Sequence, residues 1–305
     1  MSARIAVIGS CNTDMVVRLP HLPVPGETVL GGTFLIAHGG KGANQAVAAA
    51  RAGGTVAFIG RVGDDAFGRE ARSALEKEGI DVSHLLIDPA APSGVALITV
   101  DARGENAIAV APGANARLTP DDVQQARDLI AGADILVAQL EVPVETIRAA
   151  AVVAASAGVF MMLNPAPASP LDDDLLRNIA VLTPNEKEAA LLSGVPVNDD
   201  NGIIAAAEAL RKRGVQRVIL TLGERGIYFN DGILHVWMPA FHVRAVDTTA
   251  AGDVFTGAFA VALGEHQAPI DAARFACAAS AISVTRPGAQ PSAPHRSEIE
   301  SLLSD

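Results

Sequence analysis

Residues 247–257 place small residues and an acid directly before an apolar helical pattern. The stretch reads Asp-Thr-Thr-Ala-Ala-Gly-Asp-Val-Phe-Thr-Gly, and apolar residues at helical spacing predict a helix that begins at about Ala251. The first turn of a helix carries N–H groups without intrahelical partners and a partial positive charge. We therefore predict that the amides of Ala250, Ala251 and Gly252 bind an anion, with Asp253 beside it.

A carboxylate next to an anion site suits phosphoryl transfer. The amides would hold the transferring phosphate while Asp253 accepts the proton of an attacking hydroxyl group. A carboxylate of ordinary pKa is a weak base, but it suffices when the proton leaves late, as a loose transition state permits. The residues of this stretch alone leave open that Asp253 only caps the helix.

A second candidate segment, residues 38–45, reads His-Gly-Gly-Lys-Gly-Ala-Asn-Gln. Its glycines, among them Gly40 and Gly42, let the backbone come close to a ligand, while Lys41 and Asn44 can hydrogen-bond hydroxyl groups. The segment is not a Walker A loop, because Lys41 is followed by glycine and not by Ser or Thr. It also lacks the dinucleotide fingerprint Gly-x-Gly-x-x-Gly, which argues against a dinucleotide ligand.

Polar residues also follow apolar runs that are typical of buried strands. Asn12 and Asp14 come after residues 4–9, and Glu141 follows residues 134–138. Because open α/β sheets bind ligands at the carboxyl ends of their strands, these three side chains are candidate substrate contacts. A turn rich in Asx hydrogen bonds explains Asn12 and Asp14 equally well at this stage.

Three further segments suit a nucleotide and metal ions. Asn185 and Glu188 are three residues apart at a helix start, where they can order Mg²⁺-bound waters or simply cap the helix. Residues 221–226 form a glycine-containing turn after a strand and suit a position over a nucleotide. Residues 286–292 form an irregular, carbonyl-rich loop, which we expect to be a plain turn unless it meets Asp247 in space.

Alternating strand and helix patterns fill most of the chain, and these elements must position the candidate residues. The alternation predicts an α/β fold of three layers, α/β/α, with a mostly parallel central sheet. Short strands in residues 15–37 and 93–110 lie outside this pattern and predict a small β-sheet lid, which would exclude water from a reacting phosphate. The expected strands of the main sheet are 4–9, 55–60, 134–138, 159–163, 179–183, 216–221 and 227–230, and the expected helices are 46–52, 66–78, 120–131, 143–157, 186–193, 201–213, 251–264, 269–284 and 295–303.

Composition narrows the class of protein. The chain has 305 residues, half of them apolar, which suits one domain over residues 1–305 with a substantial core. A formal net charge of −11 without a long basic tract argues against nucleic-acid or anionic-membrane binding. The two cysteines, Cys11 and Cys277, argue against a disulfide framework, so we expect a cytoplasmic protein. The uncharged residues 149–171 are broken by Gly158 and prolines, so we expect no membrane span.

These motifs resemble those of the ribokinase-like, or PfkB, family of carbohydrate kinases. The family's N-terminal pattern of glycines and an asparagine is met by Gly39, Gly40, Gly42, Asn44, Gly53 and Gly63. Its C-terminal pattern, Asp-Thr-x-Ala/Gly-Ala-Gly-Asp, is met by residues 247–253. The resemblance runs from about Ile5 to the last helix, and it implies a ribokinase-like fold.

The resemblance implies ATP-dependent transfer of a phosphoryl group to the 5-hydroxyl of a pentose, with D-ribose as the expected sugar. Asp253 would be the catalytic base, and the amides of Ala250, Ala251 and Gly252 would form the anion hole. The implied sugar contacts are Asn12, Asp14, Gly40, Lys41, Gly42, Asn44, Glu141 and Asp253.

The resemblance further implies ATP, Mg²⁺ and an activating K⁺ as ligands, and a homodimer that pairs through the lid. The implied nucleotide contacts are Asn185, Glu188, Thr221, Gly223, Gly226, Gly252 and Cys277, with Glu188 near Mg²⁺. The implied monovalent-cation site consists of Asp247, Thr249, Ser283, Arg286, Gly288 and Ser292, several of them through backbone carbonyls. Cys277 departs from relatives in which a ring-bearing or other residue flanks adenine.

Two rival functions stay open. Another sugar kinase of the family, acting on 2-deoxyribose, a related pentose or a nucleoside, would share these motifs. Asn12 argues against a deoxyribokinase, because a deoxy-sugar would leave its amide unpaired. A non-catalytic, sugar-binding regulatory protein would share the scaffold but would not need a carboxylate at Asp253. A nicotinamide oxidoreductase would need the missing glycine fingerprint.

Overall fold

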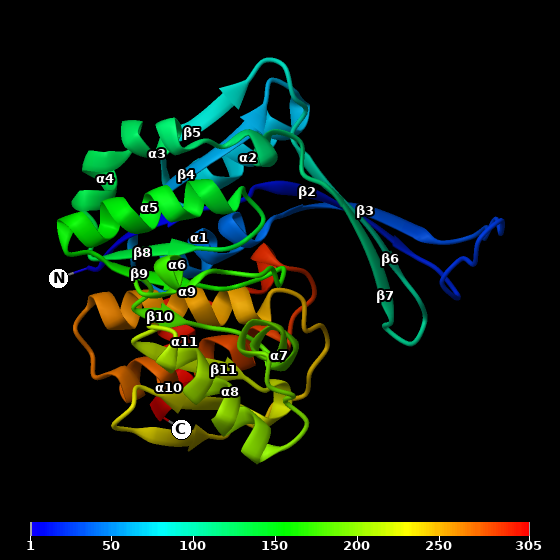
Figure 1. Ribbon diagram of the computed structural model, residues 1–305. Helices are drawn as coiled ribbons and strands as arrows, with labels where there is room; N and C mark the ends of the chain where they lie inside the picture. Colours follow the sequence, from blue (N-terminus) through cyan, green and yellow to red (C-terminus); the bar gives the residue numbers. More distant parts are fainter. Residues whose placement is uncertain (1, 305) are drawn as a thin grey trace.

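The computed structural model describes residues 2–304 and contains two β-sheets (Figure 1). The nine strands of the central sheet are, in order across it, β13 (His235–Met238), β12 (Ile227–Asn230), β11 (Arg217–Thr221), β10 (Val181–Leu182), β9 (Phe160–Leu163), β8 (Ile135–Ala138), β1 (Arg4–Ile8), β4 (Thr55–Gly63) and β5 (Asp81–Asp88). From β11 to β5 neighbouring strands pair in parallel, whereas β12 and β13 run antiparallel to their neighbours. The predicted mostly parallel sheet is confirmed.

Helices cover both faces of this sheet, and each face has its own hydrophobic core. Successive residues of β1 point to opposite faces, so Ile5 and Val7 join one core while Ala6 and Ile8 join the other. The first core packs α1 (Lys41–Arg51), α2 (Ala66–Lys77), α9 (Ala251–Gly264), α10 (Pro269–Ser283) and α11 (Arg296–Ser304). The second packs α3 (Pro120–Gln125), α4 (Arg127–Ala131), α5 (Val144–Ala157), α6 (Asp173–Leu176), α7 (Glu186–Ser193) and α8 (Asp200–Lys212). The three-layer prediction is therefore confirmed.

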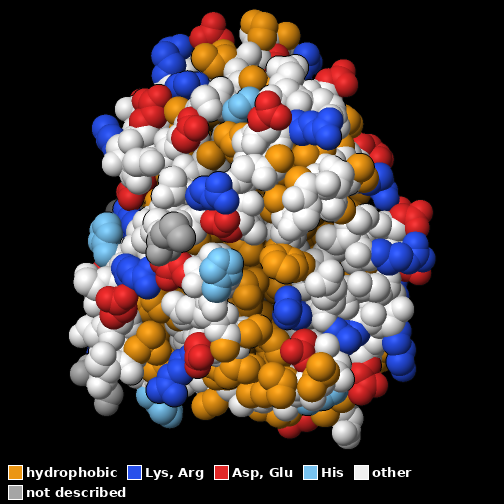
Figure 2. Space-filling model, turned by 90° about the vertical axis from the view of Figure 1, so that its left-hand side faces the viewer, with side chains coloured by type: hydrophobic (Ala, Val, Ile, Leu, Met, Phe, Trp, Pro, Cys, Tyr) orange, Lys and Arg blue, Asp and Glu red, His pale blue; other side chains and the backbone are white. Residues whose placement is uncertain are grey.

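The smaller sheet projects from one side of the molecule as the predicted lid (Figure 1). Its four strands, in order, are β3 (Thr33–Gly39), β2 (Asn12–Arg18), β6 (Gly94–Val100) and β7 (Asn106–Ala111). Strand β2 follows β1 after three residues, so the lid grows out of the carboxyl edge of the central sheet. Figure 2 shows the side away from the lid, where hydrophobic side chains gather in the lower half among scattered charges.

Two strands were not predicted, and one predicted helix is divided. Strand β5 was missed, and so was β13, a short edge strand that is half exposed and lacks a clear apolar alternation. The expected helix 120–131 begins at Pro120, where Thr119 and Asp122 form a capping box. It breaks at Ala126, whose N–H is shared between the carbonyls of Asp122 and Val123. Among residues 2–304, no helix is long and apolar enough to span a membrane.

Candidate active site

The N-terminus of α9 lies where the sequence places it, and its backbone leaves amides free for a ligand. Ala250 adopts a left-handed conformation with φ of 60°, which an alanine holds only when its surroundings impose it. The helical hydrogen bonds begin with Val254 N–H to Ala250 O, so the N–H of Gly252 precedes the ladder. Ala251 N–H donates weakly to Thr248 O at 3.3 Å. A Cβ added to Gly252 would meet no atom within 4 Å, so an anion can approach.

Asp253 lies one residue further on, and its carboxylate is buried and held from both sides. Its side chain is 5% exposed. Asn44 Nδ2 donates to Oδ2 at 3.0 Å, and Gln45 Nε2 donates to Oδ1 at 2.9 Å. Helix α9 has no side-chain cap hydrogen bond, so Asp253 is not the helix cap that the sequence left open.

The charges around Asp253 set its basicity. Burial raises the pKa of Asp253 above its ordinary value, while the Lys41 ammonium and the two amide donors oppose that rise. Glu141 adds to the rise through like-charge repulsion. In return, the negative charge of Asp253 is the first cause that raises the pKa of Lys41. The result is a carboxylate that is a stronger base than an exposed aspartate, with Lys41 and the two amides favouring its ionised form.

Two glycines bring the N-terminus of α1 against the end of β1. Gly40 has a φ of 87°, and a Cβ there would lie 2.7 Å from the backbone N of Asn12. A Cβ at Gly42 would lie 2.6 Å from the backbone N of Ser10. This close approach carries Lys41 and Asn44 to Asp253. Asn44 Oδ1 is buried without a partner among the described residues, so it can accept a ligand hydroxyl.

Glu141 follows β8 at the same sheet edge and binds the start of α1. Its Oε2 accepts Ser10 Oγ at 2.5 Å and Lys41 N–H at 3.0 Å. A carboxylate at a helix N-terminus is favoured by the helix dipole. Both of these bonds use Oε2, and Oε1 accepts no hydrogen bond among the described residues.

Asn12 is the first residue of β2, and a second asparagine fixes its amide. Asn115 Nδ2 donates to Asn12 Oδ1 at 2.7 Å, while Cys11 N–H donates to Asn115 Oδ1 at 2.9 Å. A Cβ at Gly94 would lie 2.2 Å from Asn12 Oδ1, so only glycine leaves room for this bond. Since its oxygen is occupied, Asn12 presents its Nδ2 donors to a ligand. Asn115 was missed by the sequence analysis.

Asp14 shares a lid face with Asn12, since residues two apart on a strand point to the same side. Burial raises the pKa of Asp14 to about 7, with Glu141 and Asp253 adding to the rise and Lys41 opposing it. The charge of Asp14 therefore changes near neutral pH.

The predicted nucleotide residues meet at the ends of β10 and β11. Asn185 and Thr221 form a parallel β-bridge. Asn185 and Glu188 form a capping box, with Asn185 N–H to Glu188 Oε2 at 2.8 Å and Glu188 N–H to Asn185 Oδ1 at 2.9 Å. Burial is the main cause that raises the pKa of Glu188, and Lys41 opposes it. The capping arrangement of this pair is therefore present and engages Glu188 Oε2, while Lys41 and Asp253 both act on the Glu188 carboxylate.

The remaining nucleotide candidates lie on the turn after β11 and on α10. Gly223 and Gly226 both have positive φ, and a Cβ at Gly226 would lie 2.1 Å from Met238 O. Cys277 is buried on α10, one turn before Ser280, whose Oγ donates to Ala251 O. Burial raises the pKa of Cys277 to about 12, so its thiol stays protonated.

The carbonyl-rich loop meets Asp247 in space, which was the condition set by the sequence analysis. Asp247 Oδ2 accepts Gly288 N–H at 2.9 Å, and Oδ1 accepts the N–H and Oγ1 of Thr249 at 2.9 and 2.6 Å. Although burial opposes it, these bonds lower the pKa of Asp247, so the carboxylate stays ionised. The other candidates of this site turn their side chains elsewhere: Ser283 Oγ donates to Ser280 O, Ser292 Oγ donates to Ala289 O, and Arg286 pairs with Glu298.

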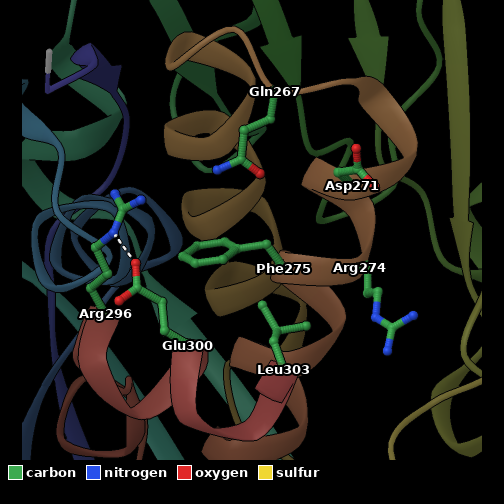
Figure 3. Close-up of a pocket in the computed structure, with 7 residues that line it drawn as sticks. All are labelled: Gln267, Asp271, Arg274, Phe275, Arg296, Glu300 and Leu303. Atoms are coloured by element: carbon green, nitrogen blue, oxygen red, sulfur yellow. Dashed lines mark hydrogen bonds and ion pairs between the residues drawn. The ribbon is translucent and has the colours of Figure 1, made fainter.

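A separate surface hollow of about 310 Å³ lies between α10 and α11 (Figure 3). None of the predicted site residues lines it. Its Arg296 pairs with Glu265 and Glu300 and lies over the ring of Phe275 at 5.7 Å. The charge of Arg296 is thus satisfied within the protein, and the hollow is not part of the candidate active site.

Known proteins match the chain over nearly its whole length. The model of the pfkB family of carbohydrate kinases matches residues 2–296. A ribokinase of Haemophilus influenzae is 44% identical over 303 residues, covering 99% of each chain. A deoxyribokinase of Salmonella typhi is 39% identical over 304 residues, covering 98% of each. The structure of Arabidopsis thaliana ribokinase complexed with ribose and ATP aligns with a TM-score of 0.92 at 33% identity, covering 100% of each chain.

A buried carboxylate beside free helix amides, at the carboxyl edge of a parallel sheet, is the arrangement of a phosphotransferase of the α/β class. The family match narrows this class of phosphotransferase to the carbohydrate kinases. The chain belongs to the pfkB family of carbohydrate kinases and has the ribokinase-like fold.

Proposed function

We propose that the protein is a ribokinase that transfers the γ-phosphoryl group of ATP to the 5-hydroxyl of D-ribose. The observation that carries the proposal is the buried Asp253 carboxylate, held by Asn44 and Gln45 beside the open amides of the α9 N-terminus. The products are D-ribose 5-phosphate and ADP. The ribokinase of Haemophilus influenzae and the ribose and ATP complex of the Arabidopsis enzyme support this choice of substrates.

In the proposed mechanism, Asp253 accepts the proton of the 5-hydroxyl as its oxygen attacks the γ-phosphorus. The bond between that phosphorus and the β,γ-bridging oxygen breaks, and ADP leaves with the electron pair. The amides of Ala250, Ala251 and Gly252 would hold the transferring group. Its charge is spread over three oxygens in the transition state, where fixed amide dipoles are most effective. Ala251 N–H would exchange its long bond to Thr248 O for the anion.

The sugar would lie between the lid and the N-terminus of α1. Asn12 would donate through Nδ2, while Asp14, Glu141 and Asn44 Oδ1 would accept hydroxyl protons. The backbone at Gly40 and Gly42 would line the pocket, and Lys41 would add a donor. The support is that Asp14, Lys41, Asn44 and Glu141 all act on Asp253 and that Asn44 Oδ1 is buried without a partner among the described residues.

The nucleotide would lie along Asn185, Thr221, Gly223 and Gly226, with Gly252 at its phosphates and Cys277 near its base. Glu188 fits a role near Mg²⁺, because its Oε1 is free of the cap and hard cations prefer carboxylate and water oxygens. When bound, Mg²⁺ would neutralise charge on the phosphate oxygens.

A monovalent cation, K⁺ by preference, would bind near Asp247 and Thr249 beside the anion hole. The support for this cation site is the ionised Asp247 carboxylate, which already connects its own segment to the loop at Gly288 through a hydrogen bond. Ser283, Arg286, Gly288 and Ser292 would contribute backbone carbonyls, since their side chains are engaged elsewhere or absent. The expected result is a higher kcat with K⁺ than with Na⁺ at equal ionic strength; equal rates would contradict the proposal.

Sugar preference is the direct test of the proposed function. We expect Mg-ATP turnover with D-ribose to exceed that with 2-deoxy-D-ribose by at least about 10-fold in kcat/KM, because one buried hydroxyl contact contributes about 1.4 kcal/mol. Fructose and adenosine should be poorer still. ADP release measures all four reactions.

Asn12→Ala is the matched variant for this preference. Removing the donor should bring the ribose to deoxyribose ratio to about 1–3, because ribose then loses the contact that deoxyribose never made. Equal use of both sugars by the wild type would favour a deoxyribokinase. Absence of turnover with every sugar would favour a non-catalytic, sugar-binding regulatory protein.

Ribose affinity should depend on pH through Asp14. The sugar hydroxyls bind the ionised carboxylate, and the pKa of Asp14 is raised to about 7 in the free protein. Lowering the pH from 8 to 6 reduces the ionised fraction about 10-fold, so the calorimetric Kd for ribose should rise about 10-fold. Asp14→Asn should bind weakly at both pH values. A wild-type Kd that is unchanged between them would show that Asp14 does not accept the sugar hydroxyls.

We also propose that the lid pairs with that of a second copy in a homodimer. The strand register places Val16, Leu35, Ile98 and Ile108 on the lid face that carries Asp14. Leu35 on β3 is 41% exposed and Ile108 on β7 is 56% exposed, so both ends of this apolar row are open to solvent.

The dimer proposal predicts that Ile108→Lys lowers the mass seen by light scattering from that of a dimer to that of a monomer. The control is Val152→Lys on α5, an equally exposed apolar position outside the lid that should leave the mass unchanged. A monomeric wild type at assay concentration would overturn the proposal.

We further propose that residues 1–305 act as one carbohydrate-kinase domain and that the enzyme works in the cytoplasm without nucleic-acid or membrane partners. Both cysteines are free and buried, and the net charge is −11. Limited proteolysis that released a stable fragment of about half the chain would contradict the single domain.

A further inference from the structure

We propose that Gln45 is a positioning residue that fixes the carboxylate of the catalytic base. The inference rests on the proposed role of Asp253 as base. Gln45 is fully buried, with an exposed fraction of 0%, and lies on α1 next to Asn44. Its Nε2 donates to Asp253 Oδ1 at 2.9 Å, while Asn44 donates to the other oxygen at 3.0 Å. Two consecutive residues therefore hold the two carboxylate oxygens.

The direction of the Gln45 amide is imposed by its other neighbours. Gln139 Nε2 donates to Gln45 Oε1 at 2.6 Å, and the second proton of Gln45 Nε2 points to Asn164 Oδ1 at 3.2 Å. Asn164 is itself fixed, because its Nδ2 donates to Thr183 O at 2.9 Å. A carboxylate can only accept, so the nitrogen of Gln45 must face Asp253. The orientation of the buried Gln45 amide is thus determined by its three hydrogen-bond partners.

These hydrogen bonds matter because the groups around Asp253 have opposing effects on the ionisation of its carboxyl group. Lys41 favours its ionised form, whereas burial and the carboxylates of Glu141, Asp14 and Glu188 disfavour it. A hydrogen bond to the charged form favours ionisation. It also removes rotation about the Cβ–Cγ bond, which leaves the carboxylate in one orientation toward an incoming hydroxyl. Since Gln45 is fully buried, the sugar cannot reach it, and it acts through Asp253.

The matched variant is Gln45→Met, which has similar length and no amide. We expect kcat at saturating ribose and ATP to fall about 10- to 100-fold, because the base is less well oriented. The acidic limb of the kcat profile should move up by about one pH unit, because one of the two bonds that favour the ionised form is lost. The KM for ribose should change less than about threefold, since no sugar contact is removed.

Two further variants keep the test decisive. Ile147→Ala removes a fully buried side chain from the opposite core, and it should lower stability without moving the acidic limb. If Gln45→Met does not fold, Gln139→Met serves instead. It does not touch Asp253 but leaves Gln45 Oε1 without its donor, so the amide is held less firmly and the limb should still move upward by a smaller amount.

The outcomes separate this inference from the proposed function. A wild type without ribose phosphorylation would overturn the function and with it the role of Asp253. An active wild type whose acidic limb stays at the same pH in the Gln45 and Gln139 variants, whatever their stability, would overturn the positioning role alone. An upward shift in the Gln variants but not in Ile147→Ala supports it.

Discussion

Asp253→Asn is expected to lower kcat for ribose phosphorylation by about 10³- to 10⁴-fold, the upper range for loss of a general base. The amide has the same shape as the carboxylate but cannot accept the proton of the 5-hydroxyl. Asn44 and Gln45 both direct donors at this position, so the asparagine oxygen can satisfy only one of them. Single-turnover and steady-state ADP release with Mg-ATP and ribose measure the loss.

Stability and binding provide the controls for this variant. Burial is the first cause that raises the pKa of Asp253, so the folded protein gives up little when the buried charge is removed. The unsatisfied donor has a cost of its own, so we expect a Tm within a few degrees of that of the wild type and a calorimetric Kd for ribose within about 10-fold. A variant with wild-type Tm and more than about a tenth of wild-type kcat would show that Asp253 is not the base.

The sequence was most informative where a motif is local. Residues 247–253 predict both the start of α9 and the neighbouring acid, because the helix signal and the acid occupy one continuous stretch. The alternating pattern likewise predicts the parallel sheet and its two helical layers. Strands β5 and β13 were missed because an edge strand, paired on one side, needs less of the apolar alternation that identifies a strand.

The contacts that the sequence did not reveal join residues far apart in the chain. Gln45 is 208 residues from Asp253, and Asn115 is 103 residues from Asn12. In the sequence, Gln45 is the last residue of the candidate segment 38–45, directly before the expected helix 46–52, and no motif marks it as a partner of Asp253. A signal did exist, since Lys41, Asn44 and Gln45 are spaced at i, i+3 and i+4 and so share one helix face. No comparable spacing marks Asn115, whose role depends on the fold of η1 (Gly113–Arg117).

Gly257 allows α1 to pack close enough to α9 for Asn44 and Gln45 to contact Asp253. Replacing it is therefore expected to have a large effect on activity. It lies on α9 one turn after Asp253, where α9 packs against α1. A Cβ at Gly257 would lie 2.6 Å from Gln45 O and 2.8 Å from Ala48 Cβ. One is an atom of the α1 backbone and the other is the methyl carbon of an alanine, and neither can rotate away. The clash is therefore relieved only if the whole helix moves. The bonds from Asn44 and Gln45 to the carboxylate would lengthen as it moves.

We therefore expect Gly257→Ala to lower kcat/KM about 10²-fold, because displacement of a catalytic group by a fraction of an ångström to 1 Å has effects of this size. Overpacking should also reduce the free energy of unfolding by about 1–3 kcal/mol. Gly264→Ala is the matched control. It lies two turns further along the same face of α9, and its Cβ would lie 2.8 Å from Ala3 Cβ. Gly264→Ala should lower Tm and retain kcat, since it disturbs packing without moving α1 relative to Asp253. If both variants lose stability equally and both keep full activity, the distance between α1 and α9 does not control the base.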